Sequence, residues 1–146
     1  MTKTSAYIAV LALLGGAAPA TAFADDGGRP LSAHLTGAAE KPNPGDTDGA
    51  GHATFKVNVG QSEVCYELSV EKIAEATMAH IHKAGPDAAG PVAVPLTKPD
   101  AAGKSKGCAK ADAAVVKDIL QNPGGYYVNV HNAEFPAGAV RGQLSK

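Results

Sequence analysis

Alternation of apolar and polar residues predicts two strands near the end of the chain, over residues 125–131 and 139–144. Successive side chains of a strand point to opposite faces of the sheet, so each segment has one apolar and one polar face. The apolar faces carry Tyr126, Val128 and Val130 in the first strand and Val140, Gly142 and Leu144 in the second. The polar faces carry Tyr127, Asn129 and His131 in the first strand and Arg141 and Gln143 in the second. The apolar side of such a hairpin has to be covered by a second layer.

The same period of two predicts four further strands, over residues 31–36, 53–59, 64–71 and 78–82. The short turn Gly60-Gln61-Ser62 joins the middle two into a hairpin. Residues 91–96 are too apolar for a loop, but their prolines confine this segment to a sheet edge. Residues 37–51 contain prolines, glycines and acids without periodicity, which indicates a loop whose acidic side chains are solvated.

One segment has helical periodicity, residues 112–121, where Asp112 can cap the N-terminus and Pro123-Gly124 follow the C-terminus. Its apolar residues are spaced four apart on one face, as the pairs Val115/Ile119 and Val116/Leu120. Six or seven short strands with frequent turns and one short helix predict an all-β fold, an antiparallel β-sandwich. An α/β fold would need helices between the strands, and the pattern provides none there.

The first 24 residues are predicted to be a signal peptide rather than part of the fold. Lys3 supplies a positive start, residues 6–18 are mostly apolar, and Ala22-Phe23-Ala24 fits the small-x-small cleavage rule, with Ala20-Thr21-Ala22 as a second candidate. The apolar run is too short to span a bilayer, and no later segment is long enough. We therefore expect an exported protein, periplasmic or secreted, with residues 25–146 as a single domain and no membrane span.

The charge of the expected mature chain is slightly negative, because loss of Lys3 leaves 12 basic and 14 acidic side chains, a net charge of −2. This balance provides no basic surface for nucleic acid, so no nucleic-acid partner is expected. Glycine and proline together account for 27 of the 146 residues, which favours turns and short strands over long helices.

Cys65 and Cys108 are the two cysteines of the chain, and in an exported protein they are expected to form one disulfide. The alternative is a pair of buried free thiols. Strand parity places Cys65 on the polar face, so the connection over residues 98–123, which carries Cys108, has to cross that face or its rim. Closing so long a loop stabilises the fold by about 4 kcal/mol in the chain-entropy treatment.

The polar faces of the predicted strands carry all five histidines: His34, His52, His80, His82 and His131. His80 and His82 lie two apart on one strand, with about 6.6 Å between their α-carbons, so their imidazoles can converge on one ion. His131 adds a third nitrogen if its strand is a neighbour. Three neutral histidines form a transition-metal site with an open position, and imidazole suits copper or zinc. The alternative is a solvated or hydrogen-bonded His80/His82 pair without a metal, and His34 and His52 are expected to be surface residues.

Polar residues near the predicted site provide candidates for a supporting shell. Asn129, Asn132 and Glu134 are expected to orient the imidazole rings by hydrogen bonds. Arg141 is expected to form an ion pair with Glu134 across the turn, or else to bind an anion. The chain contains no nucleophile elbow, no phosphate-binding glycine pattern and no calcium-loop pattern, so other catalytic chemistry has little support.

Four motifs occur in an order that resembles the CHRD, or chordin-type, domain. They are Ala79-His80-Ile81-His82, residues 90–96, residues 122–131, and Glu134-Phe135-Pro136 followed by Arg141-Gly142-Gln143-Leu144. The resemblance covers residues 30–144, and Pro136-Ala137-Gly138-Ala139 departs slightly from the usual Pro-Gly-Gly turn. It implies an immunoglobulin-like β-sandwich, similar in architecture to Cu,Zn superoxide dismutase, of a kind found in extracellular chordin and in small exported bacterial proteins.

The likeness to superoxide dismutase implies copper as the ion for the histidines. In that enzyme an H-x-H on a strand and a histidine on a later strand bind copper, and His80, His82 and His131 would be their counterparts. This chain has no clear bridging histidine and no His/Asp zinc cluster between these positions. The resemblance therefore favours metal binding without dismutation.

Three functions follow, in decreasing order of preference. The first is a non-catalytic module that binds copper or zinc through His80, His82 and His131. The second is a metal-free module that binds an unknown protein of the cell envelope or the extracellular space. The third is a superoxide dismutase-like oxidoreductase with an open copper position.

Overall fold

Eight strands and one α-helix build the fold over residues 28–146, the part of the chain that this computed structural model describes. The strands are β1 (Arg29–Thr36), β2 (Ala50–Asn58), β3 (Glu63–Glu71), β4 (Ala76–Lys83), β5 (Val92–Leu96), β6 (Lys104–Lys110), β7 (Tyr126–Asn132) and β8 (Val140–Gln143). The helix is α1 (Ala113–Gln121), and two 3₁₀ turns are η1 (Gly37–Ala39) and η2 (Pro123–Gly125). The predicted signal peptide, residues 1–24, lies outside the described residues.

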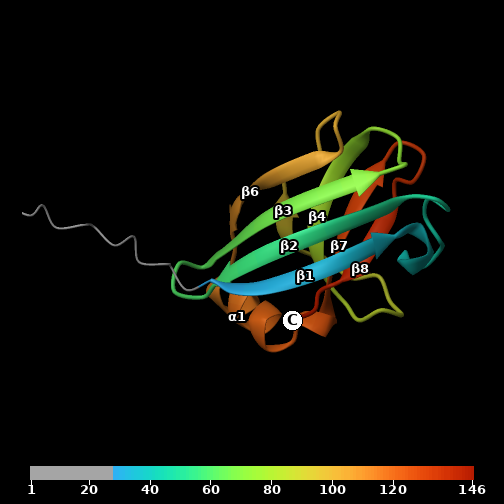
Figure 1. Cartoon of the computed structure of the whole chain (residues 1–146). Coiled ribbons are helices and arrows are strands. Elements are labelled where there is room, and N and C mark those ends of the chain that lie inside the picture. Colours follow the sequence, from blue (N-terminus) through green and yellow to red (C-terminus); the bar gives the residue numbers. More distant parts are fainter. Residues whose placement is uncertain (1–27) are drawn as a thin grey trace, which may run out of the picture.

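The strands form one antiparallel sheet in the order β5-β4-β7-β8-β1-β2-β3-β6. The sheet curls until its two end strands, β5 and β6, come into contact, so it is nearly closed. One half, β1, β2, β3 and β6, therefore faces the other half, β5, β4, β7 and β8, across the core (Figure 1). The halves are continuous through β8 and β1, which pair at Thr36 and Arg141. The predicted all-β class with one short helix is confirmed.

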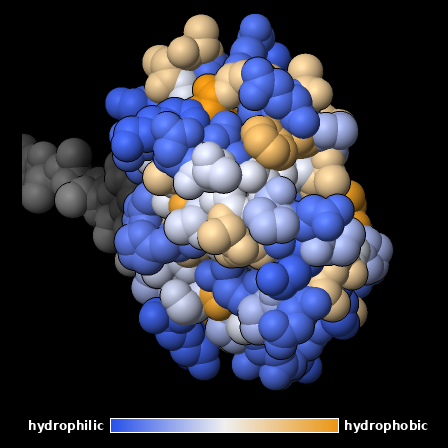
Figure 2. All heavy atoms as spheres, turned by 90° about the vertical axis from the view of Figure 1, so that its right-hand side faces the viewer, coloured by the Kyte–Doolittle hydropathy of each residue, from blue (hydrophilic) through white to orange (hydrophobic). Residues whose placement is uncertain are grey.

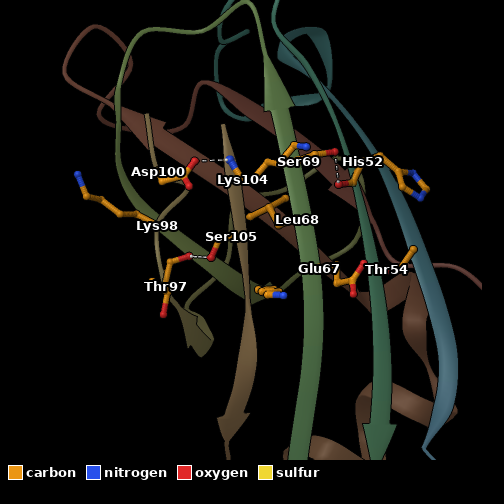
Figure 3. Close-up of a pocket in the computed structure, with 11 residues that line it drawn as sticks. His52, Thr54, Glu67, Leu68, Ser69, Thr97, Lys98, Asp100, Lys104 and Ser105 are labelled. Carbon is orange, nitrogen blue, oxygen red and sulfur yellow. Dashed lines mark hydrogen bonds between the residues drawn. The ribbon is translucent and has the colours of Figure 1, made fainter. Parts of the chain in front are cut away.

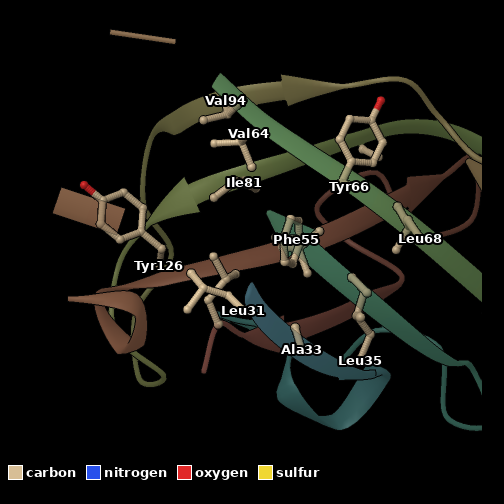
Figure 4. Packing of buried hydrophobic residues seen from close by; sticks show 14 of the residues in the cluster. Leu31, Ala33, Leu35, Phe55, Val64, Tyr66, Leu68, Ile81, Val94 and Tyr126 are labelled. Atoms are coloured by element: carbon tan, nitrogen blue, oxygen red, sulfur yellow. The ribbon is translucent and has the colours of Figure 1, made fainter. Parts of the chain in front are cut away.

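The core lies inside the curled sheet and is built from the apolar faces that the alternation predicts. Residues from opposite halves meet there, among them Phe55 on β2 and Ile81 on β4 (Figure 4). Helix α1 adds Val116 and Ile119, both with no exposed surface. Its N-terminus is capped as predicted, because Asp112 Oδ1 accepts a hydrogen bond of 2.8 Å from Ala114 N–H.

Strand β6 was not predicted, and it lies inside the segment that the sequence indicates only as a connection. Its sequence, KSKGCAK, has no large apolar residue, so it gives no alternation signal. It pairs antiparallel with β3, and this register places Cys65 directly opposite Cys108. The two sulfurs are 2.04 Å apart, so the predicted disulfide is present and joins an edge strand to its neighbour.

The face of β4, β7 and β8 that points away from the core is here called the histidine face. Its side chains are Met78, His80, His82, Tyr127, Asn129, His131, Arg141 and Gln143. Sequence parity predicts an exterior face with surface histidines, but only 8 % of His82 and 6 % of His131 is exposed. Two segments fold over this face and cover most of it, residues 37–49 against β8 and residues 84–90 against β7 and β8.

Other parts of the surface are polar. The face in Figure 2 is mostly hydrophilic, with apolar residues scattered rather than gathered in one broad patch. Among residues 28–146, no helix is long and apolar enough to cross a membrane.

Candidate metal centre

The structure brings His80, His82 and His131 together on the histidine face. His80 and His82 project from β4, His131 projects from the adjacent strand β7, and one nitrogen of each ring lies within 4.8 Å of the other two. The closest pair is His80 Nδ1 and His131 Nε2, 3.2 Å apart. The ring centroids are separated by 5.2 to 6.1 Å. The predicted convergence of these three side chains is therefore confirmed as geometry.

Backbone carbonyls fix the orientation of two of the three rings. His82 Nδ1 lies 2.8 Å from the carbonyl oxygen of Gly90, and His131 Nδ1 lies 3.0 Å from that of Pro136. A carbonyl can only accept, so each Nδ1 carries the proton, and the Nε2 of the neutral ring keeps its lone pair. His82 Nε2 is buried and has no hydrogen-bond partner. Metal-binding histidines are commonly held in this way, with the non-ligating N–H donated to a carbonyl.

The separation of the closest nitrogens fits a shared ion. Two nitrogens bound tetrahedrally at about 2.0–2.1 Å from a metal lie roughly 3.3–3.4 Å apart. His80 Nδ1 and His131 Nε2, at 3.2 Å, are already close to that spacing. With His131 donating to Pro136, the His80 ring donates its Nδ1 proton to His131 Nε2. An ion bound between these two atoms would take the place of that proton, and the neutral His80 ring would then carry its proton on Nε2.

Burial lowers the pKa of all three imidazoles below its ordinary value. For His80, the nearby rings of His131 and His82 lower the pKa further. For His82 and His131, the carbonyl hydrogen bonds partly oppose the effect of burial. The neutral form, which is the form that binds metals, is therefore favoured at neutral pH.

Arg141 holds the segment that covers the site. Residues 84–90 are called the strap, and Arg141, 1 % exposed, donates to the Ala88 carbonyl at 2.9 Å and the Gly85 carbonyl at 2.7 Å. Since Gly90 of the same strap orients His82, Arg141 acts on the ring through the strap. The predicted ion pair with Glu134 is wrong: this guanidinium is buried against carbonyls, and Glu134 is exposed on the β7–β8 loop.

Tyr127 connects Arg141, His82 and the strap. Its ring stacks on His82 with centroids 4.9 Å apart and planes inclined by 3°. The guanidinium carbon of Arg141 lies 3.4 Å from the centre of the Tyr127 ring. The Tyr127 hydroxyl accepts a hydrogen bond of 3.2 Å from Gly90 N–H. The alternation pattern predicts Tyr127 only as a polar-face residue, and no sequence signal points to a part in orienting His82.

Glu40 is a buried acid that the sequence pattern misses, because it lies in a segment expected to carry solvated charge. Only 2 % of it is exposed, and burial raises its pKa to about 7 although Arg141 and Asn129 oppose the rise. The buried side chain of Asn129 is near enough to this carboxyl and to the His82 ring to affect the pKa of both, although its Oδ1 makes no hydrogen bond. Asn129 therefore lies near a ligand candidate, but within residues 28–146 it makes no hydrogen bond to any of the three rings, so its predicted orienting role stays a prediction.

Asn132 supports the site indirectly. Its Oδ1 accepts a hydrogen bond of 2.8 Å from Phe135 N–H, which shapes the turn that carries Pro136. The Pro136 carbonyl in turn orients His131. Within residues 28–146, Glu134 makes no hydrogen bond to any of the three rings, so the prediction that it orients one is not supported.

The other two histidines are exposed, as predicted, and lie on the opposite half of the sheet. His34 on β1 and His52 on β2 are register partners with ring centroids 4.8 Å apart. His52 also lines a pocket with Glu67, Lys98 and Lys104 (Figure 3). This pocket mixes both signs of charge at exposed positions and contains none of the three clustered histidines.

Comparison with known proteins identifies the family. The model of the CHRD domain matches residues 31–144, and the chain belongs to this family. No curated protein matches the chain, and no solved structure does.

Proposed function

We propose that this CHRD-domain protein is a non-catalytic module that binds copper or zinc through His80, His82 and His131. The observation that carries the proposal is His82 Nε2, a buried lone pair without a hydrogen-bond partner, in a ring fixed by Gly90. A buried acceptor left without a donor costs roughly 1–3 kcal/mol, which an ion at this position would recover. Two further imidazole nitrogens lie within 4.8 Å.

We place this activity outside the cytoplasm. The disulfide between Cys65 and Cys108 is typical of proteins from an oxidising compartment. The sequence of residues 1–24 has the order of charge, apolar run and small residues of a signal peptide. Export to the periplasm or beyond is consistent with both features.

Metal titration tests the proposal. Purified protein titrated with Cu(II), Cu(I) and Zn(II) is expected to bind about one ion per chain, with affinity that weakens below about pH 6 as the imidazoles become protonated. The His80→Ala/His82→Ala variant should lose this binding. The matched control is His34→Ala/His52→Ala, which removes two exposed histidines from the other half of the sheet. Equal affinity in all three proteins would contradict the proposal.

A metal-free interaction module is the second candidate, and the hydrogen bonds of the rings favour it. His82 connects β4 to the strap, and His131 connects β7 to the turn at Pro136. In this function the histidines only stabilise loops that a partner protein would contact. Chelators would then leave thermal stability unchanged, and histidine variants would lose stability without any loss of metal affinity.

A superoxide dismutase-like activity is the least favoured function. It would require an open copper position that cycles with small oxygen species. Copper-loaded protein assayed for superoxide dismutation against the same concentration of free copper tests it directly. Activity no greater than that of free copper is the expected result for a non-catalytic module.

A further inference from the structure

We propose that Met78 supplies a thioether ligand to the histidine cluster, so that the site selects Cu(I) over Zn(II) and Cu(II). This inference rests on the proposed metal-binding function and adds the identity of the ion. It concerns binding alone and includes no electron transfer.

The position of Met78 in the sheet is the first observation. On β4, Ala79 and Ile81 point into the core, so Met78, His80 and His82 alternate with them and share the histidine face. The β4–β7 register makes Met78 the direct partner of His131. Directly opposite side chains have β-carbons about 4.5–5.5 Å apart, a span that the flexible methionine side chain easily covers.

The exposure of Met78 is the second observation. It is 46 % exposed, whereas the alternating apolar residues of the same strand, Ala79 and Ile81, are buried. Met78 is also the only methionine among residues 28–146. Packing in the core does not explain a large apolar side chain at this position, since its exposed half gains nothing from burial. A ligand function beside His131 does explain it.

The charge of the surroundings is the third observation. Three imidazoles and a thioether carry no negative charge, and the buried guanidinium of Arg141 lies one ring away, against Tyr127, where Glu40 and Asp87 offset part of its charge. Repulsion from this fixed positive charge is twice as large for a divalent as for a monovalent ion at the same place. Thioether sulfur is a soft ligand that favours Cu(I) and adds little for Zn(II). The soft thioether ligand and the positive charge of Arg141 therefore both favour Cu(I).

Competition against a coloured Cu(I) chelator such as bicinchoninate, without oxygen and with ascorbate present, tests the inference. Met78→Leu keeps an apolar side chain of similar size and removes the sulfur. It is expected to weaken Cu(I) binding about tenfold or more while changing Zn(II) affinity by less than about twofold. Val59→Leu is the matched control, because Val59 is 37 % exposed just after β2, on the other half of the sheet.

X-ray absorption at the copper edge gives a readout independent of affinity. The Cu(I)-loaded protein is expected to show a sulfur scatterer that the Met78→Leu protein lacks. Equal Cu(I) affinity and identical spectra for these two proteins would overturn the assignment of Met78, even if the His80→Ala/His82→Ala variant loses metal. If the unaltered protein binds neither Cu(I) nor Zn(II), the proposed function itself fails and this inference fails with it.

Discussion

Arg141 lies flat against Tyr127, with its guanidinium carbon 3.4 Å from the centre of the aromatic ring. Tyr127 stacks in turn on His82, so β8, β7 and β4 each contribute one member to a continuous stack. The guanidinium also holds two carbonyls of the strap. Arg141 therefore acts on His82 along two routes, through the Tyr127 ring and through Gly90.

Replacement of Arg141 by lysine should destabilise the fold and weaken metal binding. Lysine keeps the charge but loses the planar fork that reaches the Gly85 and Ala88 carbonyls and stacks on Tyr127. The loss of two buried hydrogen bonds is expected to lower the unfolding free energy by about 2–3 kcal/mol. Metal affinity should fall about tenfold, because the strap no longer fixes His82.

Urea denaturation and metal competition measure the two effects of Arg141→Lys. Arg29→Lys is the matched control, since Arg29 is exposed at the start of β1, far along the chain from the strap. An Arg141→Lys protein with the stability and affinity of the control would show that the strap does not orient His82.

Glu40 should make stability depend on pH near neutrality. Its folded-state pKa, about 7, is raised above the ordinary value of 4.5. Between these values the folded state keeps a proton that the unfolded state has lost, so this contribution is present at low pH and disappears as pH rises through about 7. Unfolding free energies measured from pH 6.5 to 8 should fall with pH in the natural chain and fall less in Glu40→Gln.

Glu71→Gln is the control for the Glu40 experiment, because Glu71 is an exposed acid at the end of β3. It should retain the full pH dependence of the natural chain. The interpretation of Glu40 is wrong if both variants show the same slope between pH 6.5 and 8.

The clustered histidines should give pH dependence of the opposite sign. Burial lowers the pKa of His80, His82 and His131, so below the ordinary pKa of 6.5 the unfolded state binds more protons than the folded state. Their contribution to stability is present above that value and is lost as pH falls through the lowered pKa. In a Glu40→Gln background, unfolding free energy should therefore decrease from pH 6.5 to 5, and His82→Gln/His131→Gln should flatten the decrease. A slope that these two substitutions leave unchanged would contradict the burial of the rings.

Removal of the disulfide should cost stability without affecting the metal site. Cys65 and Cys108 are 43 residues apart, and the chain-entropy treatment gives about 4 kcal/mol for a loop of this length. Cys65→Ser/Cys108→Ser is expected to lower the unfolding free energy by roughly 2–4 kcal/mol. Its metal affinity should stay within about twofold of the natural value, because the bridge lies between β3 and β6, on the other half of the sheet. A large loss of affinity in folded protein would show that the two halves are coupled.

The sequence predicts the strands and the histidine cluster because both depend on the period of two alone. Parity placed His80 and His82 on one face, and the later strand with His131 proved to be the neighbour in the sheet. The segment that covers the histidine face could not be predicted. The strap has no periodicity, and Arg141 contacts it through backbone carbonyls rather than through its side chains. For the same reason Glu40 looked solvated, although residues 37–49 fold back and bury it.

The predicted ion pair between Arg141 and Glu134 is wrong because residues that are close in sequence need not be close in space. Glu134 is the nearer acid in sequence, but the acids that act on Arg141 are Glu40 and Asp87, about a hundred and about fifty residues earlier. The hydrophobic pattern does not predict strand β6 for a different reason. A sheet edge that is exposed on both sides needs no apolar face, so the hydrophobic pattern says nothing about it.

The composition of β6 bears on how copies of this protein meet one another at high concentration. An unpaired strand edge offers N–H and C=O groups to any other chain, and charged side chains there oppose such contact. Strand β6 carries Lys104, Lys106 and Lys110, and β5, at the opposite end of the strand order, carries Pro95, which has no N–H to donate. Repulsion between lysines at one edge of the sheet and a missing donor at the other disfavour growth of the sheet into fibrils, even in concentrated protein.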